Sequence, residues 1–263
     1  YKFILMTLTF YKYQGTGNDF IIFDNRSGQF PKSDNALVAK LCDRKFGVGA
    51  DGLMLLEIEK DFDFKMVYYN SDGAESTMCG NGGRCLAAFA HSIGIIGNKG
   101  LFIAVDGSHE VAITANQVIL GMKKVTEVQN KGKYFFLDTG SPHHVQFVSD
   151  VEKINVNDQG AKLRYGMYGE QGANINFVSL DPNGRHSIRT YERGVEGETL
   201  SCGTGVTAAA IAIHEQNNGF ASPVTLHTKG GVLKVHFTKN NQVYSELSLE
   251  GPAEFVFKGE ISI

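Results

Sequence analysis

Short apolar runs alternate with turn residues along almost the whole chain. The runs are rich in Val, Ile, Phe and Tyr and are bounded by Gly, Asn or Asp, a pattern that is typical of β-strands. The first half predicts strands at 20–24, 53–58, 64–69, 101–105 and 111–115. The second half predicts strands at 134–137, 144–148, 175–179, 186–191, 224–228 and 232–237.

Three segments show helical patterns instead. Residues 82–93 and 205–216 are apolar on almost every side, which predicts one helix buried inside each half of the chain. A third helix is predicted at 33–44, with Ser33 or Asp34 as its N-cap. This pattern indicates an α+β fold, in which each half forms a curved, mostly antiparallel sheet wrapped around a central apolar helix.

The chain matches itself when it is shifted by 123 residues. Matching segments are Thr16-Gly17-Asn18 with Thr139-Gly140-Ser141, Gly49-Ala50-Asp51 with Gly172-Ala173-Asn174, Glu75-Ser76 with Glu198-Thr199, and Cys79-Gly80 with Cys202-Gly203. Because the matches share one offset and one order without a gap, they predict a duplication. We expect two pseudo-symmetric domains, residues 1–122 and 123–263, with the last strand returning to the first domain. Clefts between domains are common ligand sites, so the active site is expected in the interdomain cleft.

Charge and composition exclude several classes of function. The net charge of −3 and a pI near 6.3 provide no basic field for nucleic acid or for an anionic membrane. The sequence shows no apolar run long enough to span a bilayer. Four cysteines are too few for a disulfide scaffold, so a reduced, cytoplasmic protein is expected. Met6 is a plausible natural start, which would make residues 1–5 an upstream extension.

Cys79 and Cys202 each stand immediately before one of the two buried helices. The free N–H groups and positive dipole of a helix start lower the pKa of a nearby thiol, and they also bind carboxylates. Two such segments facing each other suit the inversion of a carbon next to a carboxylate, because one thiolate removes a proton and the opposite thiol returns one. This chemistry needs no electron-sink cofactor, and we expect no cofactor.

The other cysteine and glycine patterns support simpler interpretations. Cys79 and Cys85 lack a second Cys or His pair at metal-binding spacing, so no metal site is expected. Cys42 and Cys85 are interpreted as core residues. The segment 15–18 lacks the third glycine of a dinucleotide-binding loop and the Lys-Ser/Thr of a phosphate-binding loop.

Several segments resemble the diaminopimelate epimerase family, and the resemblance runs from about Thr9 to the C-terminus. They are Gly15–Phe20, Asn70–Gly73, Cys79–Cys85, Ala173–Asn176, Tyr191–Gly194 and Glu198–Gly205. The resemblance implies interconversion of LL- and meso-2,6-diaminoheptanedioate, without pyridoxal phosphate, in lysine and peptidoglycan precursor biosynthesis. It also suggests a homodimer that binds neither nucleic acid nor membrane.

The resemblance also assigns residues to roles. It implies that Cys79 and Cys202 are the catalytic acid/base pair. Substrate-binding positions are Gly80, Asn81, Gly203 and Thr204 at the reacting carboxylate, and Asn18, Asn70, Ser141, Asn174, Glu192 and Arg193 at the substrate's polar ends. His143 is expected to tune a thiol rather than to carry the proton.

The chain departs from the family pattern at two positions, and three alternative functions are open. Many members carry Gln where this chain has Gly52, and Asn where it has Ser141. The main alternative is a two-cysteine proline or hydroxyproline racemase, although Glu192 and Arg193 would then face a substrate without a second charged end. A non-enzymatic binding module would function without its cysteines, and a thiol redox protein would cycle a disulfide during turnover.

Overall fold

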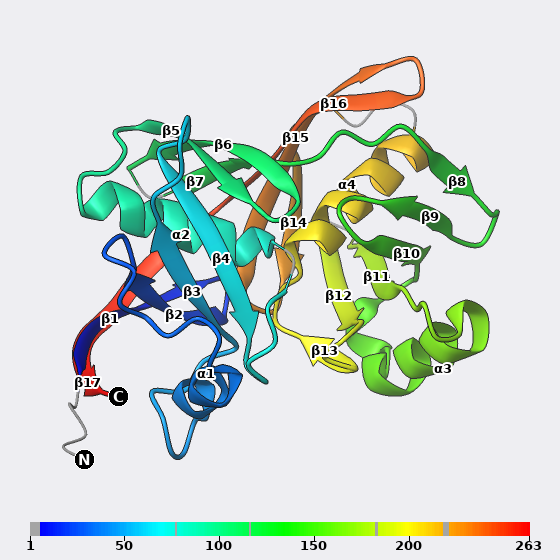
Figure 1. The fold of residues 1–263 in the computed structure, drawn as a ribbon. Helices are drawn as coiled ribbons and strands as arrows, with labels where there is room; N and C mark the ends of the chain where they lie inside the picture. The colour runs from blue at the N-terminus through cyan, green and yellow to red at the C-terminus, as the bar shows by residue number, and fades with distance from the viewer. Residues whose placement is uncertain (1–5, 77, 116, 182–183, 218–220) are drawn as a thin grey trace. The chain divides into compact units, whose positions relative to one another are not determined.

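The computed structural model describes the chain except for residues 1–5, 77, 116, 182–183 and 218–220, so the expectation about residues 1–5 lies outside the described residues. The chain divides into two compact units (Figure 1). The first contains Tyr1–Leu120 and Pro252–Ile263, and the second contains Gly121–Gly251. No helix in the described part of the chain combines the length and apolar character needed to cross a membrane.

The first unit is built around one buried helix, α2 (Gly80–Ser92). Its strands are β1 (Thr7–Gly15), β2 (Asn18–Asp24), β3 (Gly52–Glu57), β4 (Phe64–Asn70), β5 (Lys99–Ala104), β6 (Gly107–Thr114), β7 (Gln117–Gly121) and β17 (Glu254–Ser262). The pairs β2–β3 and β4–β5 are parallel, and the others are antiparallel. Helix α2 contacts β1, β2, β3, β6 and β17, so the sheet wraps around it as predicted.

A second helix of this unit, α1 (Asn35–Cys42), begins as the sequence indicated. The Asp34 side chain accepts a hydrogen bond from the Leu37 backbone N–H at 2.9 Å and caps the helix. Cys42 and Cys85 are both buried and free, and burial raises the pKa of each thiol to about 12. Both are therefore core residues, in agreement with the sequence.

The second unit surrounds α4 (Gly203–Asn217) in the same manner. Its strands are β8 (Val128–Asn130), β9 (Phe135–Asp138), β10 (Pro142–Phe147), β11 (Asn174–Leu180), β12 (His186–Glu192), β13 (Gly197–Thr199), β14 (Val224–Thr228), β15 (Gly231–Asn240) and β16 (Val243–Gly251). Only β10–β11 and β12–β14 pair in parallel. Residues Val206–Ile213 of α4 are almost all part of the core of this unit.

Strand pairing confirms the duplication but corrects its register. From β1 to β6, and again from β9 through β12 to β15, the pairs alternate between antiparallel and parallel. Leu53 pairs with Tyr69 in the first unit, and Ile175 pairs with Tyr191 in the second. The offset over these strands is therefore 122, so the expectation of one gapless offset was wrong there. The position equivalent to Gly52 is Asn174.

Helix α3 (Val156–Tyr168), together with the short 3-10 helix Val151–Lys153, was not predicted from the pattern. Two glycines interrupt the apolar periodicity of α3, and one of them is needed for packing. A Cβ at Gly160 would lie 2.4 Å from the Cβ of Tyr191, so only glycine allows this close approach of α3 to β12. Asn155 caps the helix by accepting from the Asp158 N–H at 3.3 Å.

Candidate active site

Cys79 is the N-cap residue of α2, so its side chain stands at the start of the helix, as the sequence predicted. Its carbonyl oxygen accepts a hydrogen bond from the Gly83 N–H at 2.7 Å. A Cβ at Gly82 would lie 3.0 Å from Met54 Sδ and 3.5 Å from Cys79 Cβ, so glycine keeps this first turn open. The N–H groups at the start of α2 have no acceptor within the helix and face the cysteine end.

Asn18 lies against this cysteine with a fixed amide orientation. Its Nδ2 donates to Asp51 Oδ2 at 2.7 Å, and Asp51 in turn pairs with Arg44 at 2.7 Å. The opposite amide atom, Asn18 Oδ1, accepts from Asn81 Nδ2 at 3.4 Å and lies 3.6 Å from Cys79 Sγ. The thiol of Cys79 therefore meets a hydrogen-bond acceptor.

Arg84, one turn into α2, is fully buried beneath this site. Its guanidinium donates to Asn81 Oδ1 at 3.1 Å, to Gly80 O at 3.3 Å and to Thr16 Oγ1 at 3.4 Å. All of these acceptors are neutral, and Arg84 forms no ion pair with another described residue. Burial lowers the pKa of Arg84, while the thiols of Cys85 and Cys79 act in the opposite direction.

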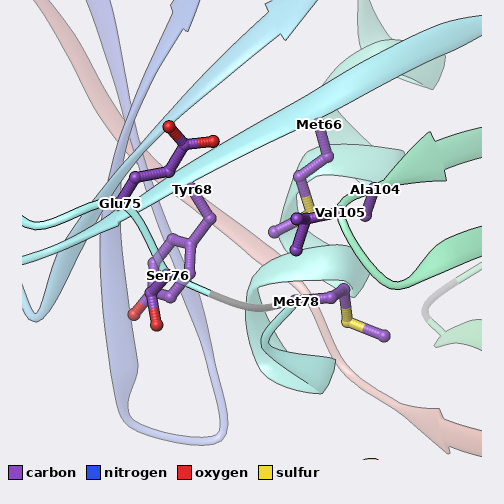
Figure 2. A pocket seen from close by; sticks show the side chains of 7 residues that line it. All are labelled: Met66, Tyr68, Glu75, Ser76, Met78, Ala104 and Val105. Carbon is purple, nitrogen blue, oxygen red and sulfur yellow. The ribbon is translucent and has the colours of Figure 1, made fainter. Parts of the chain in front are cut away.

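Asn70 and Gly52 lie opposite each other at the ends of β4 and β3, and Asn70 is exposed. A Cβ at Gly52 would approach Tyr68 Cε2 to 2.5 Å and Tyr69 O to 2.7 Å. Tyr68 therefore fills the space that the family's usual Gln would need. Figure 2 shows a small hollow next to Tyr68, lined by Met66, Tyr68, Glu75, Ser76, Met78, Ala104 and Val105.

Cys202 immediately precedes α4, and its carbonyl accepts from the Val206 N–H at 2.9 Å. Its Sγ lies 3.5 Å from Thr204 Oγ1. The expected effect of the helix start is present at Cys202, because the hydrogen bond from the Gly205 N–H lowers the thiol pKa, but the pKa as a whole is not lowered. Burial and the nearby charge of Glu192 raise its pKa well above the ordinary value, and they outweigh the hydrogen bonds from Thr204 and the Gly205 N–H.

Ser141, Asn174 and Arg193 join three segments of the second unit. Asn174 Nδ2 donates to Ser141 Oγ at 3.0 Å and to Pro142 O at 3.2 Å, while Asn174 Oδ1 accepts from the Arg193 N–H at 2.9 Å. Ser141 thus keeps a polar contact although it replaces the family's usual Asn. Thr204 Oγ1 lies 3.4 Å from Ser141 Oγ and links this group to Cys202.

Glu192 and Arg193 follow each other at the end of β12. The Arg193 guanidinium is exposed and donates to Gln171 O at 3.0 Å, and it forms no ion pair within the described part of the chain. Glu192 is half-buried and acts on Cys202. Glu192 therefore provides an anion beside Cys202, whereas the positive charge of Arg193 acts on His143.

His143 is fully buried and bonded on both sides. Its Nε2 lies 3.0 Å from Ser141 Oγ, and its Nδ1 lies 3.1 Å from Asn176 Nδ2. Burial and the positive charge of Arg193 lower its pKa to about 3, so the ring is neutral near pH 7. A neutral, enclosed imidazole fits a tuning role better than proton transfer to a substrate.

Within their own units, the site residues form two clusters. The first contains Asn18, Cys79, Gly80 and Asn81, and Asn70 lies at the end of β4, opposite Gly52. The second contains Ser141, His143, Asn174, Glu192, Arg193, Cys202, Gly203 and Thr204. Arg84 and Asn176 belong to these clusters but were not assigned from the sequence, although both lie inside the quoted motifs. No group of three or more His, Cys, Asp or Glu side chains suited to a metal ion occurs among the described residues.

Comparison with known proteins identifies the family. The family model for diaminopimelate epimerase matches residues 10–128 and 135–256. A diaminopimelate epimerase of Flavobacterium psychrophilum is 56% identical over 253 residues, which cover 95% of this chain and 99% of the relative. The diaminopimelate epimerase of Chlorobaculum tepidum is 40% identical over 259 residues, covering 95% and 99%.

Solved structures share the fold at low sequence identity. A PhzF-family phenazine biosynthesis protein of Bacillus anthracis matches with a TM-score of 0.78 at 14% identity, covering 98% of this chain and 100% of its own. A hydroxyproline epimerase of Agrobacterium vitis matches with a TM-score of 0.71 at 12% identity, covering 98% and 93%. Together with the two cysteine-led helices, the sequence matches show that this chain belongs to the diaminopimelate epimerase family.

Proposed function

We propose that this chain is an isomerase that interconverts LL- and meso-diaminopimelate by proton transfer at one α-carbon. The observation that carries the proposal is the placement of Cys79 and Cys202, each at the start of the buried helix in one of two repeats of a single topology. The relatives named diaminopimelate epimerase match almost the full chain and support the choice of substrate.

The proposed reaction uses the two thiols as base and acid. A thiolate removes the α-proton, negative charge moves toward the α-carboxylate, and a thiol on the opposite face of the carbon returns a proton. The backbone N–H groups at Gly80 and Asn81, and at Gly203 and Thr204, are proposed to bind this carboxylate. Their donors stabilise charge that develops in the transition state, and no cofactor takes part.

The remaining polar residues are proposed to hold the far end of the substrate. Arg193 would bind the distal carboxylate and Glu192 an ammonium group, because a guanidinium and a carboxylate are the natural partners of these ions. Asn18, Asn70, Ser141 and Asn174 are proposed as further contacts or supports. This charged pair favours a diamino-dicarboxylic acid over proline or hydroxyproline, the substrates of the alternative function.

The cellular setting belongs to the same proposal. We infer a role in lysine and peptidoglycan precursor biosynthesis in the cytoplasm, where the four free cysteines would stay reduced. We also infer a homodimer, because both faces of β17 expose apolar side chains, at Phe255, Val256 and Phe257, each about half accessible. Exposed apolar side chains that gather on one element mark contact surfaces.

Solvent deuterium exchange tests the function directly. LL-diaminopimelate is incubated in D₂O with reduced enzyme, and label at the α-carbon is followed by mass spectrometry and NMR. We expect label at one α-carbon and accumulation of the meso isomer, with both lost in Cys79→Ala and Cys202→Ala. L-proline and trans-4-hydroxy-L-proline form parallel arms. Exchange confined to those arms would replace the proposal with the racemase alternative.

A further inference from the structure

We propose that Asn176 is a positioning residue that sets which nitrogen of His143 carries the proton. Through the hydroxyl groups of Ser141 and Thr204, this choice directs a hydrogen bond onto the sulfur of Cys202. The inference rests on the proposed acid/base role of Cys202 and adds a residue to that site.

The amide of Asn176 has only one workable orientation. Its Nδ2 lies 3.0 Å from the backbone carbonyl of His144, which accepts hydrogen bonds and cannot donate them. Its Oδ1 accepts from the hydroxyl of Thr190 at 3.0 Å. The Thr190 hydroxyl could also accept from an amide nitrogen, so the His144 carbonyl decides the orientation. Because Asn176 is fully buried, exchanging the two amide atoms would place Oδ1 against that carbonyl oxygen, two acceptors without a hydrogen between them.

The start of α4 closes over this amide. A Cβ at Gly205 would lie 2.4 Å from Asn176 Oδ1 and 3.3 Å from Cys202 Sγ. The absence of a side chain at Gly205 therefore lets Asn176 sit directly beneath the first turn of the cysteine-led helix.

The orientation of Asn176 determines the tautomer of His143. Asn176 Nδ2 carries hydrogens and lies 3.1 Å from His143 Nδ1, so this ring nitrogen must present its lone pair. The neutral ring then carries its hydrogen on Nε2. That nitrogen lies 3.0 Å from Ser141 Oγ and donates to it.

The Ser141 hydroxyl accepts two hydrogen bonds and can donate one. Its Oγ accepts from His143 Nε2 and from Asn174 Nδ2, both at 3.0 Å. Two accepted bonds use the two lone pairs of a hydroxyl. The remaining partner of the Ser141 hydroxyl among the described residues is Thr204 Oγ1 at 3.4 Å, which accepts the Ser141 hydrogen.

Thr204 is the last residue in this series of hydrogen bonds, which runs from Asn176 through His143 and Ser141 to the sulfur of Cys202. Since its Oγ1 accepts from Ser141, its own hydrogen is directed to Cys202 Sγ at 3.5 Å. A donor aimed at sulfur stabilises the thiolate, and here it opposes the burial of Cys202 and the charge of Glu192. The charged or titratable groups that act on this part of the site are Glu192, Arg193 and His143.

The first unit contrasts with this arrangement. Cys79 Sγ faces Asn18 Oδ1, an acceptor whose orientation is held by Asp51. Cys79 thus meets a neutral amide acceptor, whereas Cys202 meets both a donor, Thr204, which favours the thiolate, and the carboxylate of Glu192, which favours the thiol. Two thiols of otherwise equivalent position are thereby made chemically different.

The first test reads the tautomer in the wild-type protein. In ¹⁵N-labelled enzyme, the ring nitrogens of His143 are assigned by comparison with His143→Gln and followed by NMR between about pH 5.5 and pH 8. We expect a neutral ring with hydrogen on Nε2 throughout. A ring with hydrogen on Nδ1, or a charged ring at pH 7, would overturn the proposal.

The second test measures Cys202 directly. Alkylation by iodoacetamide is followed by peptide mass spectrometry between about pH 6 and pH 11, and the rate of Cys79 in the same samples is the internal control. The midpoint is the pH at which the alkylation rate of Cys202 reaches half of its maximum. Thr204→Val removes the donor, and we expect this midpoint to rise by about one pH unit, which at a fixed lower pH appears as about tenfold slower alkylation. Thr204→Ser keeps the hydroxyl and should restore the wild-type midpoint.

Asn176→Asp is expected to reverse the direction of each hydrogen bond in this series instead of removing the bonds. A carboxylate cannot donate to Nδ1, so the His143 hydrogen moves to that side and each hydroxyl turns round, leaving Thr204 as an acceptor for the Cys202 thiol. We expect a higher midpoint for Cys202, and a shift in the double variant with Thr204→Val smaller than the sum of the single shifts. Fully additive shifts, or an unchanged midpoint in Thr204→Val, would contradict the proposal.

These readouts do not require turnover. If the proposed function failed, wild-type enzyme would show no deuterium exchange, while the tautomer and the alkylation midpoints would still be as expected. If only the positioning role failed, exchange would proceed and the midpoints would not respond to the Thr204 variants.

Discussion

Arg84 and Thr207 occupy equivalent positions in their helices, and each donates a hydrogen bond to the carbonyl of the first residue of its helix. Arg84 Nη1 lies 3.3 Å from Gly80 O, and Thr207 Oγ1 lies 3.0 Å from Gly203 O. A neutral hydroxyl in one repeat thus makes the bond that a buried guanidinium makes in the other. Arg84 also holds Asn81 and introduces a positive charge beneath Cys79.

The paired variants Arg84→Met and Thr207→Val separate these contributions. Arg84→Met removes hydrogen bonds from a buried guanidinium to three buried acceptors, so we expect a loss of about 2–5 kcal/mol in the free energy of unfolding and slower alkylation of Cys79. Thr207→Val removes one hydrogen bond within a helix and should lose about 1 kcal/mol. Urea unfolding and peptide mass spectrometry provide both measurements. Equal effects of the two variants would count against a special role for the charge.

Gly205→Ala and Gly166→Ala test whether the cysteine-led helix needs glycine for space. The alanine at Gly205 would collide with Asn176 Oδ1, so we expect a loss of about 1–3 kcal/mol in stability and a changed alkylation profile for Cys202. Gly166 lies in α3 with open space around it, and alanine there should stabilise the protein by up to about 1 kcal/mol. Thermal unfolding compares the two. A neutral Gly205→Ala would show that Asn176 moves aside freely.

Buried histidines predict a loss of stability in acid. Burial lowers the pKa of His143 to about 3 and that of His144 to about 4, whereas an unfolded histidine titrates near pH 6.5. Between these values the unfolded chain binds more protons. The contribution of each histidine is therefore fully present above about pH 6.5 and declines as the pH falls.

His144→Gln measures this effect, because His144 lies outside the cysteine cluster and bonds Tyr168 at 2.8 Å. For this histidine the pH-dependent loss amounts to about 3 kcal/mol at pH 4. We expect a flatter dependence of the free energy of unfolding on pH in the variant. Replacement of the exposed His91 by Gln is the control and should leave the slope unchanged. A wild-type slope in His144→Gln would refute the assignment.

Arg193→Met and Glu192→Gln address substrate selection. Each removes a proposed partner of one charged group of the substrate, so kcat/KM for LL-diaminopimelate should fall about 100-fold or more. Arg26→Met is the matched control, because Arg26 forms an exposed pair with Asp24 at 2.7 Å. Steady-state kinetics measure all three. Unchanged kinetics in Arg193→Met would remove Arg193 from the site.

Val256→Asp tests the proposed dimer. A charge among the exposed apolar side chains of β17 should weaken association, which analytical ultracentrifugation would detect as a larger monomer fraction. The control is Val105→Asp, the same substitution at a valine that is 68% exposed and lies outside β17. It should leave association unchanged. A wild-type protein that sediments as a monomer at micromolar concentration would disprove the homodimer.

Local patterns in the sequence were sufficient for much of the fold. Alternating and continuous apolar runs indicated the central strands, and the apolar segments after Cys79 and Cys202 indicated both buried helices. These signals are short-range, because strand and helix periodicity depends on neighbouring residues. The repeat likewise revealed two equivalent cysteine positions without any structure.

Long-range contacts were required for the rest. The last strand was expected to return to the first domain, but the partner and register of β17 were not: it forms a ladder with β1 between residues as distant as Thr7 and Ser262, which no local pattern indicates. The change from an offset of 123 to 122 became visible only in the strand register. The raised pKa of Cys202 depends on burial and on Glu192, and the role inferred for Asn176 depends on contacts with the two neighbouring strands, β10 and β12, and with a helix start. The sequence alone therefore identified the two thiols, whereas their different surroundings arise from tertiary packing.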